Sequence, residues 1–160
     1  HTANVLHTFS HKHGDCLIAV DVCGIGAGIV DRLIEMGDNV LAIDNAGRAD
    51  EPEKYYNKRA EIWCRAADMF AGGDVQLTNK EPRLTGQLCT PTYEFRNGKI
   101  LIESKDSIKK RLGKSPDRAD AYVNGLYALE FVEGELIGGL GSYFNEFDED
   151  DIYAGSFMSA

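Results

Sequence analysis

The sequence predicts an α/β domain, because short apolar segments typical of buried strands alternate with longer segments of helical periodicity. Cys16 to Val20 and Val40 to Ile43 are wholly apolar, as expected for central strands that are buried on both faces. Between them the apolar residues recur at helical spacing from Ile29 to Met36, and Gly37 follows as a C-terminal cap. This alternation of strand, helix and strand is the basis of the fold-class prediction.

The remaining segments supply further helices and a hairpin. Helical spacing of apolar residues predicts a helix from Thr2 to Lys12. Pro52 is expected to start a long helix that ends at Gly72-Gly73, with a buried face formed by Tyr55, Tyr56, Ile62, Trp63, Ala66, Ala67 and Phe70. The later elements are a short helix near Arg83 to Leu88, a hairpin of Thr92 to Arg96 and Lys99 to Glu103 around Asn97-Gly98, a basic helix from Ser107 to Leu112, and a helix from Asp117 to Leu129 with Ser115 as N-cap and Pro116 at its first position.

Length and composition fit one globular domain of ordinary hydrophobicity. The chain has 160 residues, of which 43% are hydrophobic, and no apolar run approaches the roughly 18 residues that a membrane span needs. The four cysteines show no CxxC pairing, so we expect reduced, packed thiols. The sequence starts at His1 within a helical pattern and has no signal peptide, and we interpret it as a piece of a longer protein.

The net charge of −9 is concentrated at one end of the chain. Residues 129–160 contain eight of the 26 acidic residues and no lysine or arginine, so 18 acidic and 17 basic residues remain in 1–128. The body of the chain is nearly neutral, and its overall acidity neither excludes nor supports a nucleic-acid partner. We expect residues 1–131 to form the folded domain and residues 132–160 to form an acidic C-terminal tail, in which the run from Glu146 to Asp151 is solvated.

A glycine-rich turn follows the first buried strand. Gly24 to Gly28 form a Gly-x-Gly-x-Gly turn, and Asp44 follows the second strand about 20 residues later, which is close to a dinucleotide-binding fingerprint. Two departures count against that function. Ile29 stands where the third glycine is expected, and Asp21 places a negative charge where the pyrophosphate would bind. A Rossmann-like dinucleotide-binding domain that uses this turn and Asp44 is the alternative hypothesis.

The same departures fit a cluster of acidic residues that binds divalent metal. Asp21 ends an apolar strand, whereas Asp117 and Asp120 lie three residues apart at the start of a later helix and therefore on one face of it. Carboxylates at strand ends and helix starts can hold two divalent ions, one of which activates water while the other stabilises the leaving oxygen in phosphodiester hydrolysis. The structural alternative is that Asp117 and Asp120 only complement the helix dipole.

Four segments carry motifs in a fixed order along the chain. They are DVCGIGAGIVDRL from Asp21 to Leu33, YNKRAEIW from Tyr56 to Trp63, IESKD from Ile102 to Asp106 with Lys110-Arg111, and SPDRADA from Ser115 to Ala121. Together they resemble the large terminase subunit of tailed bacteriophages, in its C-terminal nuclease domain, over roughly residues 15 to 128. The resemblance implies an RNase H-like fold, which is a mixed sheet flanked by helices.

The resemblance also implies an activity, a metal site and partners. The family's nuclease cuts concatemeric viral double-stranded DNA with Mg²⁺ or Mn²⁺. By position, Asp21 would be the acid of the second strand, and Asp120, with Asp117 beside it, would be the acid of the last helix. The implied partners are double-stranded viral DNA, the portal and the small terminase subunit, in a packaging complex in the cytoplasm of the bacterial host and without a membrane.

Two parts of the family's pattern have no counterpart in this sequence. They are the first strands of the nuclease sheet, which carry another catalytic aspartate, and the N-terminal ATPase. We therefore expect an N-terminally truncated domain, and a non-catalytic remnant of a terminase is a further alternative.

A basic stretch precedes the acidic helix and consists of Lys105, Lys109, Lys110 and Arg111. A solvated face is the ordinary interpretation of such a run. Beside a metal site the same side chains would hold the DNA backbone, and both interpretations stand.

Other polar and aromatic residues have structural interpretations. The spacing of His7, His11, His13, Asp15 and Cys16 is poor for a zinc site, and we interpret them as surface residues. The aromatic side chains near Trp63 are expected in the core, and Arg59 could pair with the neighbours of Glu61 or with a nearby carboxylate.

Overall fold

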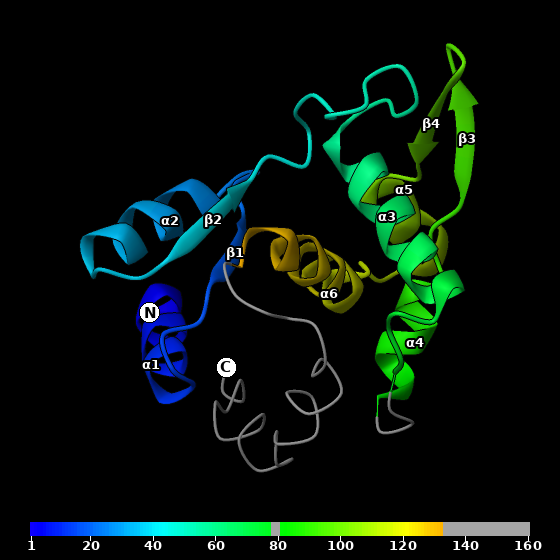
Figure 1. Cartoon of the computed structure of the whole chain (residues 1–160). Helices are drawn as coiled ribbons and strands as arrows, with labels where there is room; N and C mark the ends of the chain where they lie inside the picture. The colour runs from blue at the N-terminus through cyan, green and yellow to red at the C-terminus, as the bar shows by residue number, and fades with distance from the viewer. Residues whose placement is uncertain (78–80, 133–160) are drawn as a thin grey trace.

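The computed structural model describes residues 1–77 and 81–132, and it confirms the α/β fold class (Figure 1). The elements, in chain order, are α1 (Thr2–Lys12), β1 (Ile18–Asp21), α2 (Gly26–Glu35), β2 (Val40–Ile43), α3 (Lys58–Gly72), α4 (Pro82–Leu88), β3 (Tyr93–Arg96), β4 (Lys99–Ile102), α5 (Lys105–Leu112), α6 (Asp117–Ala128) and the 3₁₀-helix η1 (Leu129–Phe131). The predicted acidic tail lies outside the described residues from position 133 onward.

Strands β1 and β2 pair in parallel, with Ile18 opposite Val40 and Asp21 opposite Ile43. Helix α2 connects them, as expected for parallel neighbours. Parallel pairing brings the carboxyl ends of both strands to one edge of the sheet. Asp21 therefore lies beside the loop that follows β2.

Helices cover both faces of this sheet, as Figure 1 shows. On one face, Ala3 of α1 and Val30 and Leu33 of α2 pack against Ile18 and Val20 of β1. On the other face, α3 and α6 share a core with β2, which consists of Ile43, Ile62, Trp63, Ala66, Ala119, Val123 and Leu126. This second core holds the start of α6 against the end of the sheet.

Strands β3 and β4 form the predicted antiparallel hairpin, with Tyr93 opposite Ile102. Asn97 and Gly98 have φ values of 53° and 77°, the left-handed conformation that a two-residue hairpin turn requires. The hairpin stands beside the start of α3 (Figure 1). The Asn-Gly signal therefore predicted both the turn and the register of its strands.

Helix α3 begins later than its predicted start at Pro52. It begins at Lys58, after the N-cap residue Asn57, whose side-chain oxygen accepts a hydrogen bond from Ala60 N at 3.0 Å. A side-chain cap of this kind satisfies a backbone donor of the first turn, which a proline signal does not. The predicted helix start at Pro52 is therefore wrong, and the cap residue Asn57 marks the start of the helix.

The residues just before α3 are held by the hairpin instead. Ile100 N donates to Lys54 O at 2.8 Å, and Tyr56 N donates to Ile100 O at 2.9 Å. Tyr55 is buried between these bonds, as predicted, whereas Tyr56 and Ala67, which were also expected in the core, are exposed. Pairing with a distant strand thus overrides the local helical pattern.

Helix α6 starts at Asp117 as predicted, but its cap differs from the prediction. Pro116 is the N-cap residue rather than the first helical residue, and Ser115 Oγ donates to Asp117 Oδ1 at 2.6 Å. The cap comes from α4, because Gln87 Oε1 accepts hydrogen bonds from the N–H groups of the next two residues of α6, at 2.9 and 3.2 Å. A distant side chain therefore completes the start of this helix.

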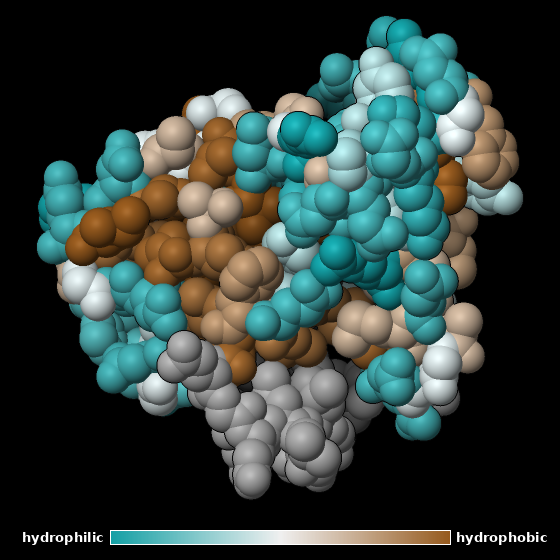
Figure 2. All heavy atoms as spheres, turned by 45° about the horizontal axis from the view of Figure 1, so that its top comes forward, coloured by the Kyte–Doolittle hydropathy of each residue, from teal (hydrophilic) through white to brown (hydrophobic). Residues whose placement is uncertain are grey.

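Figure 2 shows apolar side chains gathered over the half of the molecule that contains α2 and the sheet, while hydrophilic side chains cover the half with α3 and the hairpin. Among the large apolar residues, Ile25 and Ile34 are 87% and 59% exposed. Within 1–77 and 81–132, no helix is both long enough and apolar enough to cross a membrane.

Candidate functional site

Asp21 is the last residue of β1, and its carboxylate emerges at the carboxyl edge of the sheet. Its side chain is 23% exposed. Oδ1 accepts a hydrogen bond from Cys23 N at 3.0 Å, which fixes the carboxylate against the turn that follows. The other oxygen, Oδ2, is left to face the neighbouring elements.

Geometry requires two glycines in the turn after Asp21. Gly24 has a φ of 78°, a conformation that favours glycine. At Gly26 a Cβ atom would lie 1.8 Å from Asp21 O, so the first turn of α2 packs directly on the backbone of Asp21. A Cβ at Gly28 would meet no atom of the described residues within 4 Å. The close approach at Gly26 therefore fixes Asp21 at the sheet edge.

Asp120 lies in the first turn of α6 and is 5% exposed. Its Oδ1 accepts hydrogen bonds from Arg59 Nη2 at 2.7 Å and from Trp63 Nε1 at 3.1 Å, both on α3. Of the two kinds of partner that the sequence offers to Arg59, the structure shows a carboxylate, that of Asp120. Oδ2 is buried and accepts no hydrogen bond from the described residues.

Lys105 connects the two acidic residues. Its Nζ lies 3.3 Å from Asp21 Oδ2 and 3.5 Å from Asp120 Oδ2, and its side chain is 40% exposed. The ammonium group offsets the repulsion between the two carboxylates. The structure thus brings Asp21 and Asp120 together around Lys105, a residue that the sequence grouped with the basic stretch.

Neighbouring groups favour the ionised form of Asp21. Burial tends to raise the pKa of Asp21, but hydrogen bonds from Cys23 and Asn45 and the Lys105 ammonium outweigh burial, so this pKa lies below its ordinary value. Burial and the nearby carboxylates of Asp21 and Asp44 raise the pKa of the Cys23 thiol. At neutral pH the site therefore presents a carboxylate beside a neutral thiol.

Two buried asparagines, which none of the sequence motifs singled out as site residues, support the cluster. Asn45 follows β2 and is 7% exposed, and Asn124 lies one turn after Asp120 and is 6% exposed. Asn45 Nδ2 donates to Asn124 Oδ1 at 3.4 Å, which ties the end of the sheet to α6. The available signals were the position of Asn45 at the end of a buried strand and the i, i+4 spacing of Asn124 from Asp120.

The structure does not join the other predicted site residues to this cluster. Asp117 is exposed, and its carboxylate accepts the hydrogen bond from Ser115. Lys109 and Lys110 are exposed on α5, and Arg111 is bound to Glu103. Their roles in binding metal or DNA stay predictions.

The ion pair of Glu103 and Arg111 anchors α5 to the end of the hairpin. Arg111 Nη2 lies 2.6 Å from Glu103 Oε2, and this hydrogen bond is the main cause that lowers the pKa of Glu103 from 4.5 to about 2. We expect Arg111→Gln to raise this pKa toward 4.5, as measured by NMR titration of the side-chain carboxyl group, and Lys110→Gln to leave it unchanged.

The sign of the corresponding pH dependence follows from the depressed pKa of Glu103. A carboxyl group with a lowered pKa in the folded state stabilises the fold above its unfolded pKa. In the wild type this stabilisation is present above pH 4.5 and is lost as the pH falls toward 2. A Glu103 pKa that stays near its wild-type value in Arg111→Gln would contradict the assigned cause.

The acid cluster fits a divalent metal ion. Asp21 Oδ2 and Asp120 Oδ2 face the same ammonium group, and the buried Asp120 oxygen has this 3.5 Å ion pair but no hydrogen bond from the described residues. An unsatisfied buried acceptor costs free energy, and a cation at this point would satisfy it. Carboxylate oxygens are the ligands that Mg²⁺ and Mn²⁺ prefer.

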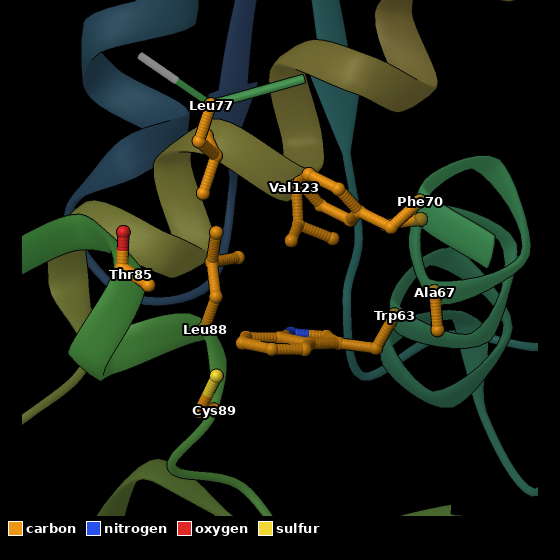
Figure 3. Close-up of a pocket in the computed structure, with 9 residues that line it drawn as sticks. Trp63, Ala67, Phe70, Leu77, Thr85, Leu88, Cys89 and Val123 are labelled. Carbon is orange, nitrogen blue, oxygen red and sulfur yellow. The ribbon is translucent and has the colours of Figure 1, made fainter. Parts of the chain in front are cut away.

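An apolar cavity of about 300 Å³ lies next to the cluster, between α3, α4 and α6 (Figure 3). In Figure 3, Trp63 and Phe70 of α3 face Leu88 of α4 and Val123 of α6 across this space. The lining is nearly all apolar, so the cavity does not suit a phosphate group. Trp63 belongs to both sites, because its ring lines the cavity while its Nε1 donates to Asp120.

Comparison with protein-family models and with curated proteins found no match. Solved structures of the nuclease domain of the large terminase subunit gp2 of bacterial virus Sf6 are similar. The domain itself has a TM-score of 0.57 at 22% identity and covers 76% of this chain and 69% of its own. A point mutant with manganese and β-thujaplicinol has a TM-score of 0.63 at 20% identity, with the same coverage of 76% and 69%.

The same mutant with calcium has a TM-score of 0.57 at 21% identity and again covers 76% of this chain and 69% of its own. At this level of identity, the similarity establishes the fold. The chain therefore has the RNase H-like fold of the nuclease domain of a phage large terminase subunit, which its four sequence motifs predict.

Proposed function

We propose that this chain is the nuclease domain of a viral DNA-packaging terminase and that it hydrolyses phosphodiester bonds of concatemeric double-stranded DNA with divalent metal. The observation that carries the proposal is the convergence of Asp21 and Asp120 on Lys105, at the end of a sheet of this fold. Similar domains have been solved with manganese and with calcium, which supports a divalent ion at the acid cluster.

The residues of the cluster have separate tasks in this proposal. Asp21 and Asp120 would each offer Oδ2 to the ion, while Arg59 and Trp63 hold Oδ1 of Asp120 and keep its carboxylate from rotating. A Mg²⁺ or Mn²⁺ ion bound here would make a water molecule more acidic and offset the charge that develops on the phosphate. We include Asp117 as a ligand of a second ion, which requires its carboxylate to leave Ser115.

The proposed partners follow from the resemblance and from charge. Exposed Lys109 and Lys110 would contact the DNA backbone beside the cluster, where cations contribute affinity without sequence preference. Double-stranded viral DNA, the portal and the small terminase subunit are the proposed partners, in a packaging complex in the cytoplasm of the bacterial host.

Nicking of supercoiled plasmid DNA tests the proposed activity. We expect cleavage that requires Mg²⁺ or Mn²⁺ and that stops with EDTA. Asp21→Asn should reduce it by at least about 100-fold, because losing even a residue that supports a metal ligand costs 10- to 100-fold. Asp31→Asn, which changes an exposed carboxylate on α2, is the matched control and should retain activity. Cleavage that survives Asp21→Asn contradicts the proposal.

Binding measurements separate the proposal from its two alternatives. Calorimetry should detect Mn²⁺ binding that Asp21→Asn weakens. Metal binding without cleavage would favour a non-catalytic remnant, whereas NAD binding that is insensitive to Asp21→Asn would favour a dinucleotide-binding domain. Substitution of Gly26 cannot distinguish these functions, because any side chain introduced there would collide with Asp21 O and disturb the fold in either case.

A further inference from the structure

A second group of ligand-type side chains lies on the face of the sheet that α1 and α2 cover. His7 and His11 are one turn apart on α1, and both face Asp38, which follows α2. His7 Nδ1 lies 3.0 Å from Asp38 Oδ2, and His11 Nε2 lies 4.0 Å from Asp38 Oδ1. One ligand atom from each residue lies within 4.8 Å of the other two.

The Asp38 carboxylate indicates that this group is more than a chance surface cluster. Its side chain is 1% exposed, and its buried Oδ1 accepts no hydrogen bond within the part of the chain that the structure describes. A buried carboxylate oxygen without a donor costs free energy. The nearest nitrogen of His11, at 4.0 Å, is beyond hydrogen-bond distance, so the space between them suits an ion.

We propose that His7, His11 and Asp38 bind a first-row transition-metal ion of the Zn²⁺ type. Imidazole ligands favour Zn²⁺, whereas Mg²⁺ and Ca²⁺ prefer oxygen alone. Tetrahedral Zn²⁺ places its ligand atoms about 3.3–3.5 Å apart, so the ligand atoms here, which lie within 4.8 Å of one another, must approach by at most about 1.5 Å. The two imidazoles are 28% and 50% exposed and have room to turn toward the ion.

Asp15 adds a supporting contact to this group. Its carboxylate contacts Nδ1 of His11, the nitrogen that faces away from Asp38. A carboxylate on the distal nitrogen of a coordinating imidazole fixes the ring and increases its basicity. Water can supply the fourth ligand because the site opens to solvent at His11. Sequence spacing could not reveal this set, since Asp38 lies outside the N-terminal segment in which the histidines cluster.

The ion would fasten α1 to the turn before β2. The buried residues of α1 are Ala3 and Ser10, and Leu6 is partly buried against the same core, so this helix is attached by few apolar side chains. Metal that binds the folded state and not the unfolded chain adds its binding free energy to folding. We infer a structural ion, distinct from the metal of the oxygen-only acid cluster.

Calorimetry with Zn²⁺ on the tag-free chain, in saturating Mg²⁺ to occupy the acid cluster, tests the proposal. We expect a single tightly bound Zn²⁺ ion and a rise in the melting temperature. His7→Gln and His11→Gln should each weaken binding by at least about tenfold. His13→Gln, at the end of the same helix but outside the group, is the matched control. Equal Zn²⁺ affinity in all four proteins overturns the proposal.

A measurement on the unmodified chain keeps the test valid if a variant fails to fold. Zn²⁺ should shift the imidazole NMR resonances of His7 and His11 and leave those of His13 in place. The proposal is wrong if Zn²⁺ produces no shift, or if it perturbs His13 or the cysteines while His7 and His11 are unaffected.

Discussion

Gly26→Ala is expected to lower the free energy of unfolding by about 3 kcal/mol, because the new Cβ would lie 1.8 Å from Asp21 O. Neither atom can move away by rotation of a side chain, since both are fixed by the backbone. Helix α2 must therefore shift away from β1. For a domain of this size the melting temperature should fall by about 6–12 °C, as measured by thermal and urea denaturation.

Gly28→Ala, two residues further along the chain in helix α2, provides the matched control. A Cβ there meets no atom within 4 Å in the part of the chain that the structure describes, and the residue is already helical. Alanine favours helix over glycine, so this substitution should be neutral or stabilise the fold by up to about 1 kcal/mol. Equal losses of stability at the two positions would falsify the close approach of α2 to Asp21.

Arg59→Met should destabilise the fold by about 3–5 kcal/mol, because it removes the buried charged partner of Asp120 Oδ1 and leaves this carboxylate paired only with the half-exposed Lys105. Arg59 and Asp120 are 8% and 5% exposed, and their 2.7 Å contact joins α3 to α6. Arg59 also donates to Glu103 O, so the end of the hairpin loses a contact as well. Urea denaturation gives the change in free energy directly.

Three further variants, Arg118→Met, Asp120→Asn and the double variant, test whether the effect of Arg59→Met comes from the buried pair. Arg118 pairs with Glu81 on the surface, with side chains 45% and 37% exposed, so Arg118→Met should cost at most about 1 kcal/mol. The double variant Arg59→Met/Asp120→Asn should be more stable than the sum of the single effects predicts, by about 1–3 kcal/mol. Strict additivity would mean that the two side chains act independently.

The sequence predicts best the helices and strands whose positions are determined by residues within them or directly next to them. The strand, helix and strand of β1, α2 and β2 follow from apolar periodicity, and the hairpin follows from Asn97-Gly98. Helix starts were predicted less well. Asn57 and Ser104 cap α3 and α5 through their own side chains, and both residue types are typical N-caps that the sequence displays. The cap of α6 could not be predicted, because Gln87 reaches it from another helix.

The same division applies to the candidate site. Asp21 could be singled out because a charge at the end of a buried strand is unusual, and Asp120 because of its position at a helix start. That Lys105 lies between them depends on the packing of α5 and α6, which no local pattern encodes. The pairing of Asn45 with Asn124 is likewise a consequence of tertiary structure.

Trp63 is an intrinsic fluorescence probe of this protein. It is the only tryptophan in the sequence, so all indole fluorescence of the chain originates from this one side chain. Its Nε1 donates to Asp120 at 3.1 Å, and its ring lines the apolar cavity. Emission wavelength and intensity therefore respond to the surroundings of this indole, which include the Asp120 carboxylate, without any attached label, and quenching by small apolar solutes reports access to the cavity.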